Sequence, residues 1–594
     1  MKAARSIRRR VLPEGVQTPV DDVLARVLAL RGVVDSADWD YGLAGLAAPQ
    51  LLSGIEAAVD RLELALQAGE RIVVVGDFDA DGATSTAVAL RALSAMGARD
   101  VHFRVPNRFE YGYGLTPEIV TVLKPLNASV LITVDNGVSS LDGVAAARSA
   151  GMSVVVTDHH LPGSQLPDAD ALVNPNVPGD DFPSKHLAGV GVIFYVMLAL
   201  RARLRDKGWF RQQDIQEPNL AQLLDLVALG TVADVVPLDH NNRIPVEQGL
   251  RRIRAGAAVP GITALLEVAG RDPRRTVATD LGFAAGPRLN AAGRLDDMAL
   301  GIRCLLTDDP AEARSLAAAL DELNRDRREI EAQMQAEALE ALADQPVQDW
   351  ADRYGLCLYE PQWHQGVIGI LAARIKERLH RPVIAFADAG DGQVKGSARS
   401  IPGLHIRDAL DAVAACNPGL ITKFGGHAMA AGLSLPLENL GAFSEAFDRT
   451  VAQRVAPEDL EGVIYSDGEL GVHQINLETA AHLRDAGPWG QGFPAPLFDG
   501  EFQILDRRVL AERHLRLQLR AGPDAPPITG IAFNVDWEDW PEGLDRVHLA
   551  YRLEVNEYRG LVSPQLMIEH VSSLDAGCVQ DENAEHAEAQ RTRG

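Results

Sequence analysis

Residues 71–90, RIVVVGDFDADGATSTAVAL, decide the fold of the first half of this chain. The run RIVVV is short, apolar and β-branched, which is typical of a strand that is buried on both faces of a parallel sheet. The alternating carboxylates Asp77, Asp79 and Asp81 follow the strand. Such carboxylates repel one another strongly unless a cation lies among them, so this turn is a candidate cation site.

The residues after the acidic turn predict a helix. Gly82 lets the backbone turn tightly, Thr84 and Ser85 can cap a helix, and apolar spacing continues through TSTAVALRALSAMG. The DxDxDG pattern also occurs in EF-hand calcium loops. That interpretation fails here, because no Glu stands at the twelfth position and a buried strand precedes the loop where an EF-hand has a helix.

Strands and helices continue to alternate outward from this stretch, from about residue 56 to residue 240. An amphipathic run, IEAAVDRLELALQAG, precedes the first strand, and VHFRV, VLITV and MSVVV have the composition of further strands. This alternation predicts an α/β domain with a parallel sheet covered on both faces. Because ligands bind at the carboxyl ends of parallel strands, the residues that follow these strands form the candidate site.

The residues that follow the strands are carboxylates and imidazoles. VLITV leads to Asp135, MSVVV leads to Asp158, His159 and His160, and the apolar run DLVALGTVADVVPL carries Asp234. One Asp after a strand is usually a turn or capping residue. The whole set at one sheet edge instead predicts two divalent ions about 3.5–4 Å apart, bridged by one carboxylate. Oxygen ligands and an imidazole, without a thiolate, favour Mn²⁺ or Mg²⁺ over zinc.

Positive side chains for a phosphate are also present. GPRLNAAGRL supplies Arg288 and Arg294, in what we expect to be a glycine-punctuated loop, and NRFEYGYGL supplies Arg108. Arginine suits phosphate because its planar fork donates two parallel hydrogen bonds. For each arginine alone, a surface salt bridge is the more common role. Together with the metal set, they indicate an in-line displacement at phosphorus.

GDFDADGATS, VDNGVSS, TDHH and ALGTVADVVPL resemble the successive motifs of the DHH phosphoesterase superfamily, named for the triplet at residues 158–160. The resemblance implies that two metal ions are held by Asp77, Asp79, Asp81, Asp135, His159 and Asp234. Asp135 would bridge the ions, and Asp77 is either a ligand or lies beside the attacking water. His160 and Arg288 complete the implied catalytic set. Many members have His where this chain has Val75, so we expect the first metal site to bind more weakly.

Residues 311–345 contain neither Pro nor Gly and are rich in Ala, Leu, Glu and Arg. They predict a long connecting helix between two domains. A coiled-coil dimer seam is the alternative, but the heptad pattern is short and irregular. The α/β segment that follows, residues 346–455, contains WHQGVIGILAARIKE, GSARSIPGLHIRDAL and KFGGHAMAAGLSL, which resemble the DHH-associated domain.

The resemblance assigns the DHH-associated domain to the end of the substrate strand. Ser397 and Arg399, together with Arg108, would grip the terminal 5′ phosphate. A glycine pair would bring the backbone close to the ligand, with an imidazole beside it: Gly425, Gly426 and His427. A blind pocket of this kind excludes internal phosphates and double strands, and so makes a nuclease an exonuclease.

Residues 456–572 are β-rich, with strand-like runs HLRLQL, ITGIAF, VHLAYRLEV and SPQLMIEHV, and predict a small closed barrel. GPWGQGFPAPLF, RHLRLQL and YRLEVNEYRGLVSPQLMIEHV resemble the OB-fold barrel of the RecJ family of bacterial 5′-to-3′ exonucleases. Phe493 departs from the family's GxGNP pattern, where Asn is expected. Aromatic and basic side chains that can stack bases or hold the strand are Trp489, Phe493, Arg513, His514, Arg516, Tyr558 and Arg559. Trp489 and Phe493 are equally compatible with barrel core.

The length of 594 residues requires several domains. We expect short helical pieces over 1–55, the DHH domain over 56–310 and an acidic disordered tail over 573–594. The basic start, MKAARSIRRR, lacks the apolar region of a secretory signal and is either a flexible phosphate-binding arm or a solubilising terminus. No apolar run approaches the roughly 20 residues of a membrane helix.

The composition bears on location and on substrate. Four scattered cysteines without a CxxC pair argue against a zinc site or disulfides and indicate the reducing cytoplasm. The formal net charge of −25 opposes general affinity for nucleic acid, so DNA binding would need a local basic groove. Part of the acidity lies in the tail, and part in the predicted metal cluster.

The motifs together indicate a metal-dependent 5′-to-3′ exonuclease on single-stranded DNA that releases 5′ mononucleotides in repair and recombination. A DHH-type oligoribonuclease or small-phosphoester phosphatase is one alternative, but such relatives are not expected to carry this barrel. A non-catalytic replication scaffold is another, although its sign, replaced carboxylates, is missing here. The resemblance implies a monomer that works beside single-strand binding protein and a helicase.

Overall fold

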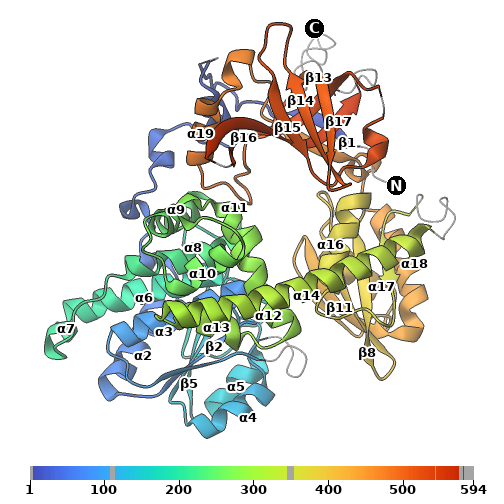
Figure 1. Ribbon diagram of the computed structural model, residues 1–594. Coiled ribbons are helices and arrows are strands. Elements are labelled where there is room, and N and C mark those ends of the chain that lie inside the picture. The colour runs from blue at the N-terminus through green and yellow to red at the C-terminus, as the bar shows by residue number, and fades with distance from the viewer. Residues whose placement is uncertain are drawn as a thin grey trace, which may run out of the picture. The chain divides into compact units, whose positions relative to one another are not determined.

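The computed structural model describes residues 5–19, 21–106, 114–343, 353–541, 543–558, 560–573 and 579–580 (Figure 1). The chain forms two compact units. The DHH unit consists of residues 35–327 and 487–494, and the barrel unit consists of residues 1–34, 328–486 and 495–594. None of the helices in the described ranges is both long enough and apolar enough to cross a lipid bilayer.

The DHH unit is built on a parallel sheet, as the alternating strand and helix pattern predicts. Its five strands lie in the order β3-β2-β4-β5-β6. Their bounds are β2 Ile72–Gly76, β3 Val101–Arg104, β4 Val130–Val134, β5 Ser153–Thr157 and β6 Ala171–Val173. Every residue of β2 and β4 is buried, which explains their continuous apolar sequence. The carboxyl ends of β2, β4 and β5 therefore meet at one edge.

Helices cover both faces of this sheet (Figure 1). One face, which includes Val73, Leu131 and Val154, packs against α4 (Pro117–Leu123) and α5 (Leu141–Ser149). On the other side lie α2 (Ile55–Ala68), α3 (Ala80–Ala95) and α6 (Gly189–Asp206). Because side chains alternate along each strand, they pack into two separate apolar layers, one on each face of the sheet.

The rest of the DHH unit is helical and packs around α3. Its elements are α7 (Trp209–Gln212), α8 (Leu224–Ala233), α9 (His240–Arg254), α10 (Pro260–Val268), α11 (Ala278–Asp280), the π-helix η7 (Leu281–Ala285), α12 (Gly286–Leu295) and α13 (Ala299–Leu306). GPRLNAAGRL, expected as a loop, is α12. The long helix is α14, Pro310–Ala343, which confirms the connecting helix.

The barrel unit contains a mixed sheet in the order β10-β11-β9-β8-β7. Its strands are β7 Leu356–Tyr359, β8 Val383–Gly390, β9 Gln393–Arg399, β10 Lys423–Gly426 and β11 Ala430–Pro436. One face packs against α16 (Ile368–Leu379) and the end of α14, and the other packs against α17 (Ile406–Cys416) and α18 (Leu440–Ala452). An α/β DHH-associated domain is therefore present.

A closed barrel in the order β13-β14-β15-β17-β16 follows, as expected for an OB-fold. Its strands are β13 Phe498–Leu510, β14 His514–Arg520, β15 Ile528–Ala532, β16 Arg546–Tyr558 and β17 Leu561–Ser573. The four strand-like runs all lie in strands. The long first strand, β13, was not expected, because its buried start gives way to the charged stretch LDRRVL.

The N-terminal segment contains the expected short helical pieces, α1 (Val23–Ala29), η1 (Ser36–Trp39), η2 (Leu43–Gly45) and η3 (Pro49–Leu51), but its basic start is not a free arm. Arg5–Arg9 form a strand, β1, which pairs in parallel with β12 (Gly462–Ser466). Arg9 forms an ion pair with the buried Asp499 at 2.7 Å, so part of the basic start is structural. Of the predicted acidic tail beyond residue 573, the structure describes only β18, Val579–Gln580, which lies beside β1.

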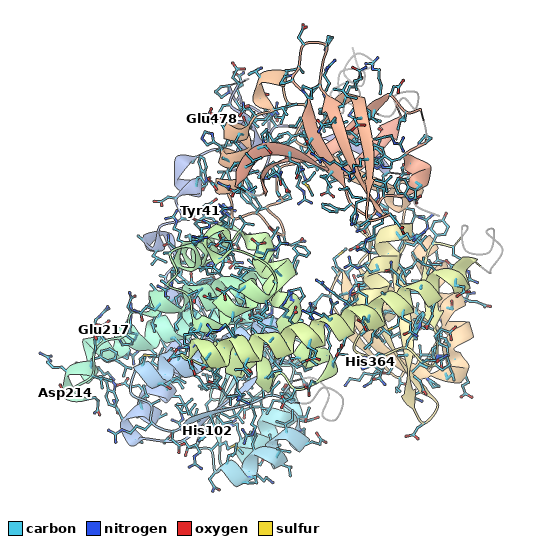
Figure 2. The ribbon with its side chains drawn as sticks, viewed as in Figure 1. Tyr41, His102, Asp214, Glu217, His364 and Glu478 are labelled. Carbon is cyan, nitrogen blue, oxygen red and sulfur yellow. The ribbon has the colours of Figure 1, made fainter. Side chains whose placement is uncertain are left out.

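The segment GPWGQGFP belongs to the DHH unit and not to the barrel. Leu238 N donates to Gln491 O at 2.7 Å, and the rings of Trp489 and Phe493 stack 5.1 Å apart. Arg243 lies 4.3 Å over the Phe493 ring and 5.7 Å over Tyr41, which Figure 2 labels. Of the two alternatives for Phe493, barrel core is therefore excluded: its ring is buried under an arginine of α9.

Candidate metal centre

The acidic turn is organised by the start of α3. Asp79 is the N-cap, and its Oδ1 accepts hydrogen bonds from Asp81 N and Gly82 N, both at 3.0 Å. The helix thus begins before Thr84, whose hydroxyl donates to Ala80 O at 2.9 Å. The expectation that Thr84 and Ser85 cap the helix is wrong, because an aspartate earlier in the turn takes that role. Asp77 Oδ1 accepts a hydrogen bond from the backbone amide of Phe78 at 2.8 Å.

Asp81 is buried at the N-terminus of α6. Its Oδ2 accepts from Gly189 N at 2.6 Å and its Oδ1 from Val190 N at 2.9 Å. Burial raises the pKa of Asp81 to about 7, with the charge of Asp79 adding to the shift and the two amides opposing it. The helix N-terminus therefore orients this carboxylate without neutralising it.

Asp135 follows β4 with a left-handed backbone, φ +61°. Its amide donates to Thr157 O at 3.1 Å, which keeps it against β5. A Cβ on Gly189 would lie 2.5 Å from Asp135 Cβ, so only glycine fits where α6 begins. The next side chain, Asn136, donates to Val75 O and Val134 O and ties the ends of β2 and β4 together.

The triplet after β5 divides into an orienting residue and two imidazoles. Asp158 accepts from Val138 N at 2.8 Å and lies 2.7 Å from His160 Nδ1. Burial raises the pKa of Asp158, but the hydrogen bond and charge of His160 lower it to about 2. Burial lowers the pKa of His160, but Asp158 raises it to about 9. Asp158 therefore orients His160 and, together with the charges of Asp77 and Asp234, raises its pKa, a role that the motif alone did not reveal.

Asp234 reaches the site from a helix. It is the C-cap of α8, and its amide donates to Gly230 O at 2.9 Å. The sequence had suggested that all the ligands follow strands, which is wrong for this one. A Cβ on Gly230 would lie 2.2 Å from Thr84 Oγ1, so the glycine lets α8 pack against α3 and bring Asp234 into range.

The structure brings the predicted metal residues together. His159 Nε2 lies 3.1 Å from Asp135 Oδ1 and 3.5 Å from Asp234 Oδ2. Among the residues that the structure describes, three groups have ligand atoms within 4.8 Å of one another: Asp77, Asp79 and Asp135; Asp81, His159 and Asp234; Asp135, His159 and His160. Asp135 belongs to two of these groups, as a bridging ligand should.

The donor set fits divalent cations. Burial raises the pKa of Asp135 and of Asp234 well above the ordinary range, and the neighbouring carboxylates raise both further. Cations among these oxygens would relieve that repulsion. Aspartate oxygens and two imidazoles, with no cysteine among the donors, suit Mn²⁺ or Mg²⁺.

Helix α12 contacts the acidic turn, but its Arg288 forms an ion pair with α14. Asn290 Oδ1 accepts from Ala80 N at 2.8 Å, a contact that sequence analysis missed. A Cβ on Gly293 would lie 1.6 Å from Phe78 O, so α12 touches the turn directly. Arg288 is buried and forms an ion pair with Asp321 of α14 at 2.7 Å. Its charge is thus balanced within the protein.

The predicted end-gripping residues lie on β9. Arg399 Nη1 donates to Ser397 Oγ at 3.1 Å, and burial lowers the pKa of Arg399. A Cβ on Gly369 of α16 would lie 2.8 Å from Arg399 Nη2, so this glycine leaves room for the guanidinium. The third predicted gripping residue, Arg108, lies outside the described residues.

Further predicted substrate-binding residues lie on β10, in the turn that follows it, and on strands of the barrel. Gly425 and Gly426 end β10, and His427 N donates to Ala430 O at 2.8 Å in the turn to β11. Gly426 has φ +144°, and a Cβ there would lie 2.4 Å from Ala431 Cα, so the hairpin itself requires it. Arg516 points outward from β14. The side chain of Tyr558 and all of Arg559 lie outside the described residues.

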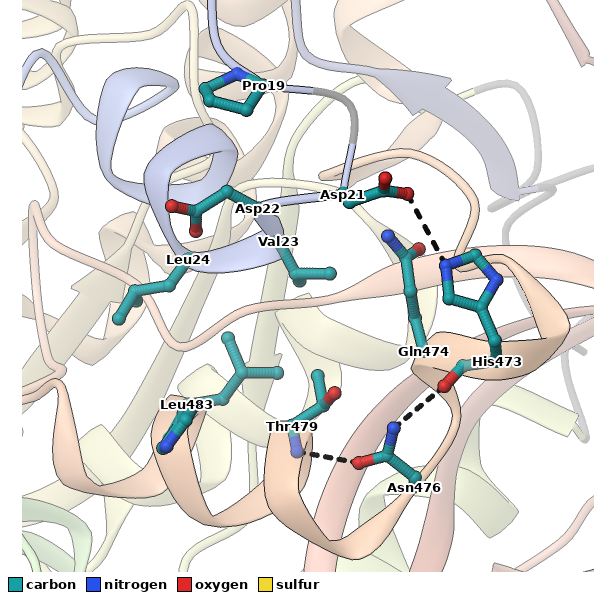
Figure 3. Close-up of a pocket in the computed structure, with 11 residues that line it drawn as sticks. Pro19, Asp21, Asp22, Val23, Leu24, His473, Gln474, Asn476, Thr479 and Leu483 are labelled. Atoms are coloured by element: carbon teal, nitrogen blue, oxygen red, sulfur yellow. Dashed lines mark hydrogen bonds and ion pairs between the residues drawn. The ribbon is translucent and has the colours of Figure 1, made fainter.

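The barrel unit also has a pocket of about 580 Å³ beside α1 (Val23–Ala29) and α19 (Leu477–Asp485) (Figure 3). Asn476 caps α19 by accepting from Thr479 N at 2.8 Å. Asp21 and His473 form an exposed ion pair at 3.4 Å. Because its polar groups serve a helix cap and a surface ion pair, we assign this pocket no role.

Comparison with known proteins supports the family resemblance that the motifs indicated. Three family models match the chain: the DHH family N-terminal domain over residues 71–231, the DHHA1 domain over 352–453 and the RecJ OB domain over 466–570. The single-stranded-DNA-specific exonuclease RecJ of Dickeya dadantii is 56% identical over 576 residues, which are 97% of this chain and 100% of the relative. The protein of the same name from Escherichia coli K12 is 54% identical over 574 residues, covering 96% and 100%.

Solved structures agree with these matches. RecJ from Thermus thermophilus in complex with Mn²⁺ has a TM-score of 0.78 and 30% identity, covering 96% of this chain and 79% of that chain. Its complex with Mg²⁺ has a TM-score of 0.73 and 29% identity, covering 96% and 78%. The resemblance inferred from the motifs is confirmed, and with it the fold. The chain belongs to the RecJ family of single-stranded-DNA-specific exonucleases.

Proposed function

We propose that this chain is a divalent-metal-dependent exonuclease that degrades single-stranded DNA from the 5′ end and releases 5′ mononucleotides in repair and recombination. The observation that carries the proposal is the position of Asp135, whose ligand atom falls in two of the three groups that can hold a metal ion. A shared carboxylate at the end of a parallel strand is what a two-metal hydrolase requires.

Each residue of the centre has a part in this chemistry. Asp77, Asp79, Asp81, His159 and Asp234 would hold two divalent ions around Asp135. Ions bound there would supply an activated water molecule and positive charge for the attacking and leaving oxygens at phosphorus. His160, whose Nδ1 lies 2.7 Å from Asp158, is oriented by that carboxylate beside Asp135 and His159. Arg288 acts indirectly, because it fixes α12 against α14 through Asp321.

The polarity of digestion depends on the grip on the strand's end. Arg399 and Ser397 are held together on β9, with the guanidinium largely removed from water. Arg108 joins them in our proposal. A desolvated arginine binds a terminal phosphate dianion strongly, whereas an internal phosphodiester carries less charge. This difference favours a 5′-phosphorylated end.

We place this activity in the cytoplasm, in a monomer that works beside single-strand binding protein and a helicase. The scattered cysteines support a reducing compartment. A helicase supplies single strands from a duplex, and a monomer needs no second subunit because the metal residues all come from one unit.

A digestion time course with purified protein and Mn²⁺ tests the proposal. The substrates are single-stranded DNA labelled at either end, the matching duplex and the matching RNA. Release of labelled mononucleotides from the 5′ end of single-stranded DNA alone is the expected result. Activity only on short RNA or on small phosphoesters would move the protein to another branch of the DHH superfamily. A lack of cleavage with any divalent ion would favour the scaffold alternative.

A further inference from the structure

The π-helix η7, Leu281–Ala285, lies directly beside the metal centre. A Cβ on Gly282 would lie 3.2 Å from Val232 Cγ1, and one on Gly286 would lie 3.0 Å from Ala233 Cβ. Val232 and Ala233 form the last turn of α8, which ends at the metal residue Asp234. Single π-turns are rare and occur often at functional sites. The segment is therefore held against the end of the helix that supplies a ligand.

The same segment is also tied to the acidic turn. It leads without a break into α12, which begins at Gly286, and Asn290 of α12 accepts from Ala80 N at 2.8 Å. Thus η7 is fixed to the centre on two sides, through α8 and through α12. A side chain that projects from η7 keeps a defined position relative to the metal residues.

Phe283 projects from η7 into solvent. It is 77% exposed, the largest fraction among the large apolar side chains of the described residues. An aromatic ring so exposed contributes little to the core, and its exposure is unfavourable in the free protein. Its neighbours Leu281, Ala284 and Ala285 are buried, so the fold does not need a phenylalanine here for packing.

A second exposed apolar residue lies next to a metal residue along the chain. Val235 follows Asp234 directly, is 63% exposed and has φ +62°. A left-handed backbone is unfavourable for a β-branched residue, and such strain gathers at functional sites. Two exposed apolar side chains, each on irregular backbone, thus lie on segments at the end of α8: Phe283 on η7 and Val235 after Asp234.

We propose that Phe283, together with Val235, is a stacking platform for a nucleobase of the DNA strand at the metal centre. This inference rests on the proposed function, since the strand must pass Asp234 if its phosphates are cleaved there. An aromatic face binds any base and so suits an enzyme without sequence preference. In a duplex the bases are already stacked on each other, so the platform also favours single strands. Phe283 is a substrate-positioning residue.

The test combines a protein variant with a modified substrate. Phe283→Ala removes the ring, Phe283→Trp keeps an aromatic face, and Leu64→Ala removes an exposed apolar side chain from α2 as a matched control. Each enzyme degrades 5′-phosphorylated single-stranded DNA that carries one abasic residue at successive positions from the 5′ end. Initial rates at several concentrations separate KM from kcat.

We expect Phe283→Ala to raise KM for intact DNA by about 5-fold or more, with kcat nearly unchanged, because one stacked base is worth roughly 1 kcal/mol or more. Phe283→Trp and Leu64→Ala should behave like the wild type. One abasic position should slow the wild type and have no further effect on Phe283→Ala. Thermal unfolding should be unchanged in Phe283→Ala, because the ring is exposed.

Abasic effects that are equal in the wild type and in Phe283→Ala at every position would overturn the platform, because the ring would then touch no base. So would an unchanged KM in Phe283→Ala. Failure of the wild type to degrade intact single-stranded DNA is a different result and contradicts the proposed function itself.

Discussion

Two clusters of buried aspartates, one in each unit, show how the same side chain serves function or stability. In the DHH unit, five aspartates meet two histidines, and the pKa values of Asp135 and Asp234 are raised by burial and by mutual repulsion. In the barrel unit, Asp499 lies 2.7 Å from Arg9 and 2.9 Å from His548. Burial raises the pKa of Asp499, but these partners and Ser466 lower it below the ordinary range.

The difference lies in the counter-charge. Asp467 in the barrel unit also has cationic partners in the protein, at 2.9 Å from Arg31 and 3.1 Å from Arg10. The carboxylates of the DHH unit outnumber the cationic side chains beside them, so the missing positive charge must come from outside the chain. A buried acidic cluster with its arginines is structural, and one that lacks them indicates a ligand site.

The largest effect is expected from Asp135→Asn. This change keeps the shape of the side chain but removes the charge that bridges two ions, so cleavage should fall by more than about 100-fold. The metal-free protein should be as stable as the wild type or more stable, because a like-charge cluster is relieved. Asp142→Asn, at an exposed position on α5, is the control. Ordinary turnover of Asp135→Asn would disprove the two-metal assignment.

Asp499→Asn should lower stability and leave cleavage unchanged, which is the opposite of the result expected for Asp135→Asn. Arg9 loses its counter-charge and His548 loses its carboxylate partner, so the free energy of unfolding should fall by about 2–3 kcal/mol. The usual cost of breaking a buried pair is reduced here because Arg9 is partly exposed. The metal centre is untouched, so the folded variant should retain its rate of cleavage. Chemical denaturation and a digestion assay measure the two effects. Asp506→Asn, exposed on the same strand, is the control, and an equal loss there would rule out the ion pair as the cause.

The dependence of stability on pH should separate the clusters. The pKa of Asp81 is raised to about 7, and those of Asp135 and Asp234 are also raised. The folded state therefore holds more protons than the unfolded state. The metal-free protein should lose stability as pH rises from about 4 through 7 and beyond. Asp499 has a lowered pKa, so its contribution is present above about pH 4 and is lost below it.

Thermal unfolding between about pH 5 and 8, with and without added Mn²⁺, measures the loss of stability that the metal-centre aspartates should cause. Mn²⁺ should raise the melting temperature most at about pH 8, and Asp135→Asn should flatten the pH profile. A melting temperature of the metal-free protein that rises steadily over this range would contradict the assigned shifts.

The smallest effect is expected from Arg399→Ala. Loss of the guanidinium should reduce the preference for a 5′-phosphorylated end over a 5′-hydroxyl end by about 10-fold, while kcat for the hydroxyl end changes little. Competition between the two substrates measures this ratio. Lys423→Ala removes an exposed cation from the same sheet and should keep the preference. If both kinds of end slowed equally in Arg399→Ala, the residue would not be reading the terminal phosphate.

Local sequence was sufficient wherever neighbours along the chain determine the structure. The apolar strands, the acidic turn after β2 and the triplet after β5 follow from patterns within about ten residues, and parallel pairing then brings their ends together. The motifs also led to the correct family, and the metal residues that they indicated do lie within a few ångströms of one another.

Tertiary structure decided the features that depend on distant partners. Arg288 looked like a phosphate ligand until Asp321, on a different helix, was seen to balance its charge. Asp234 was expected at the sheet edge after an apolar run, but that run is the helix α8, which packs against α3 and α9. Phe493 looked like part of the barrel, yet its ring lies under Arg243 in the other unit.

The sequence by itself thus determined the type of fold, the chemical nature of the centre and the family of this protein. Only the tertiary structure decided which charges are balanced and which are available to a ligand. The physical reason is that the periodicity and the order of residues act locally, whereas burial and counter-charge depend on segments that the chain brings together from far apart.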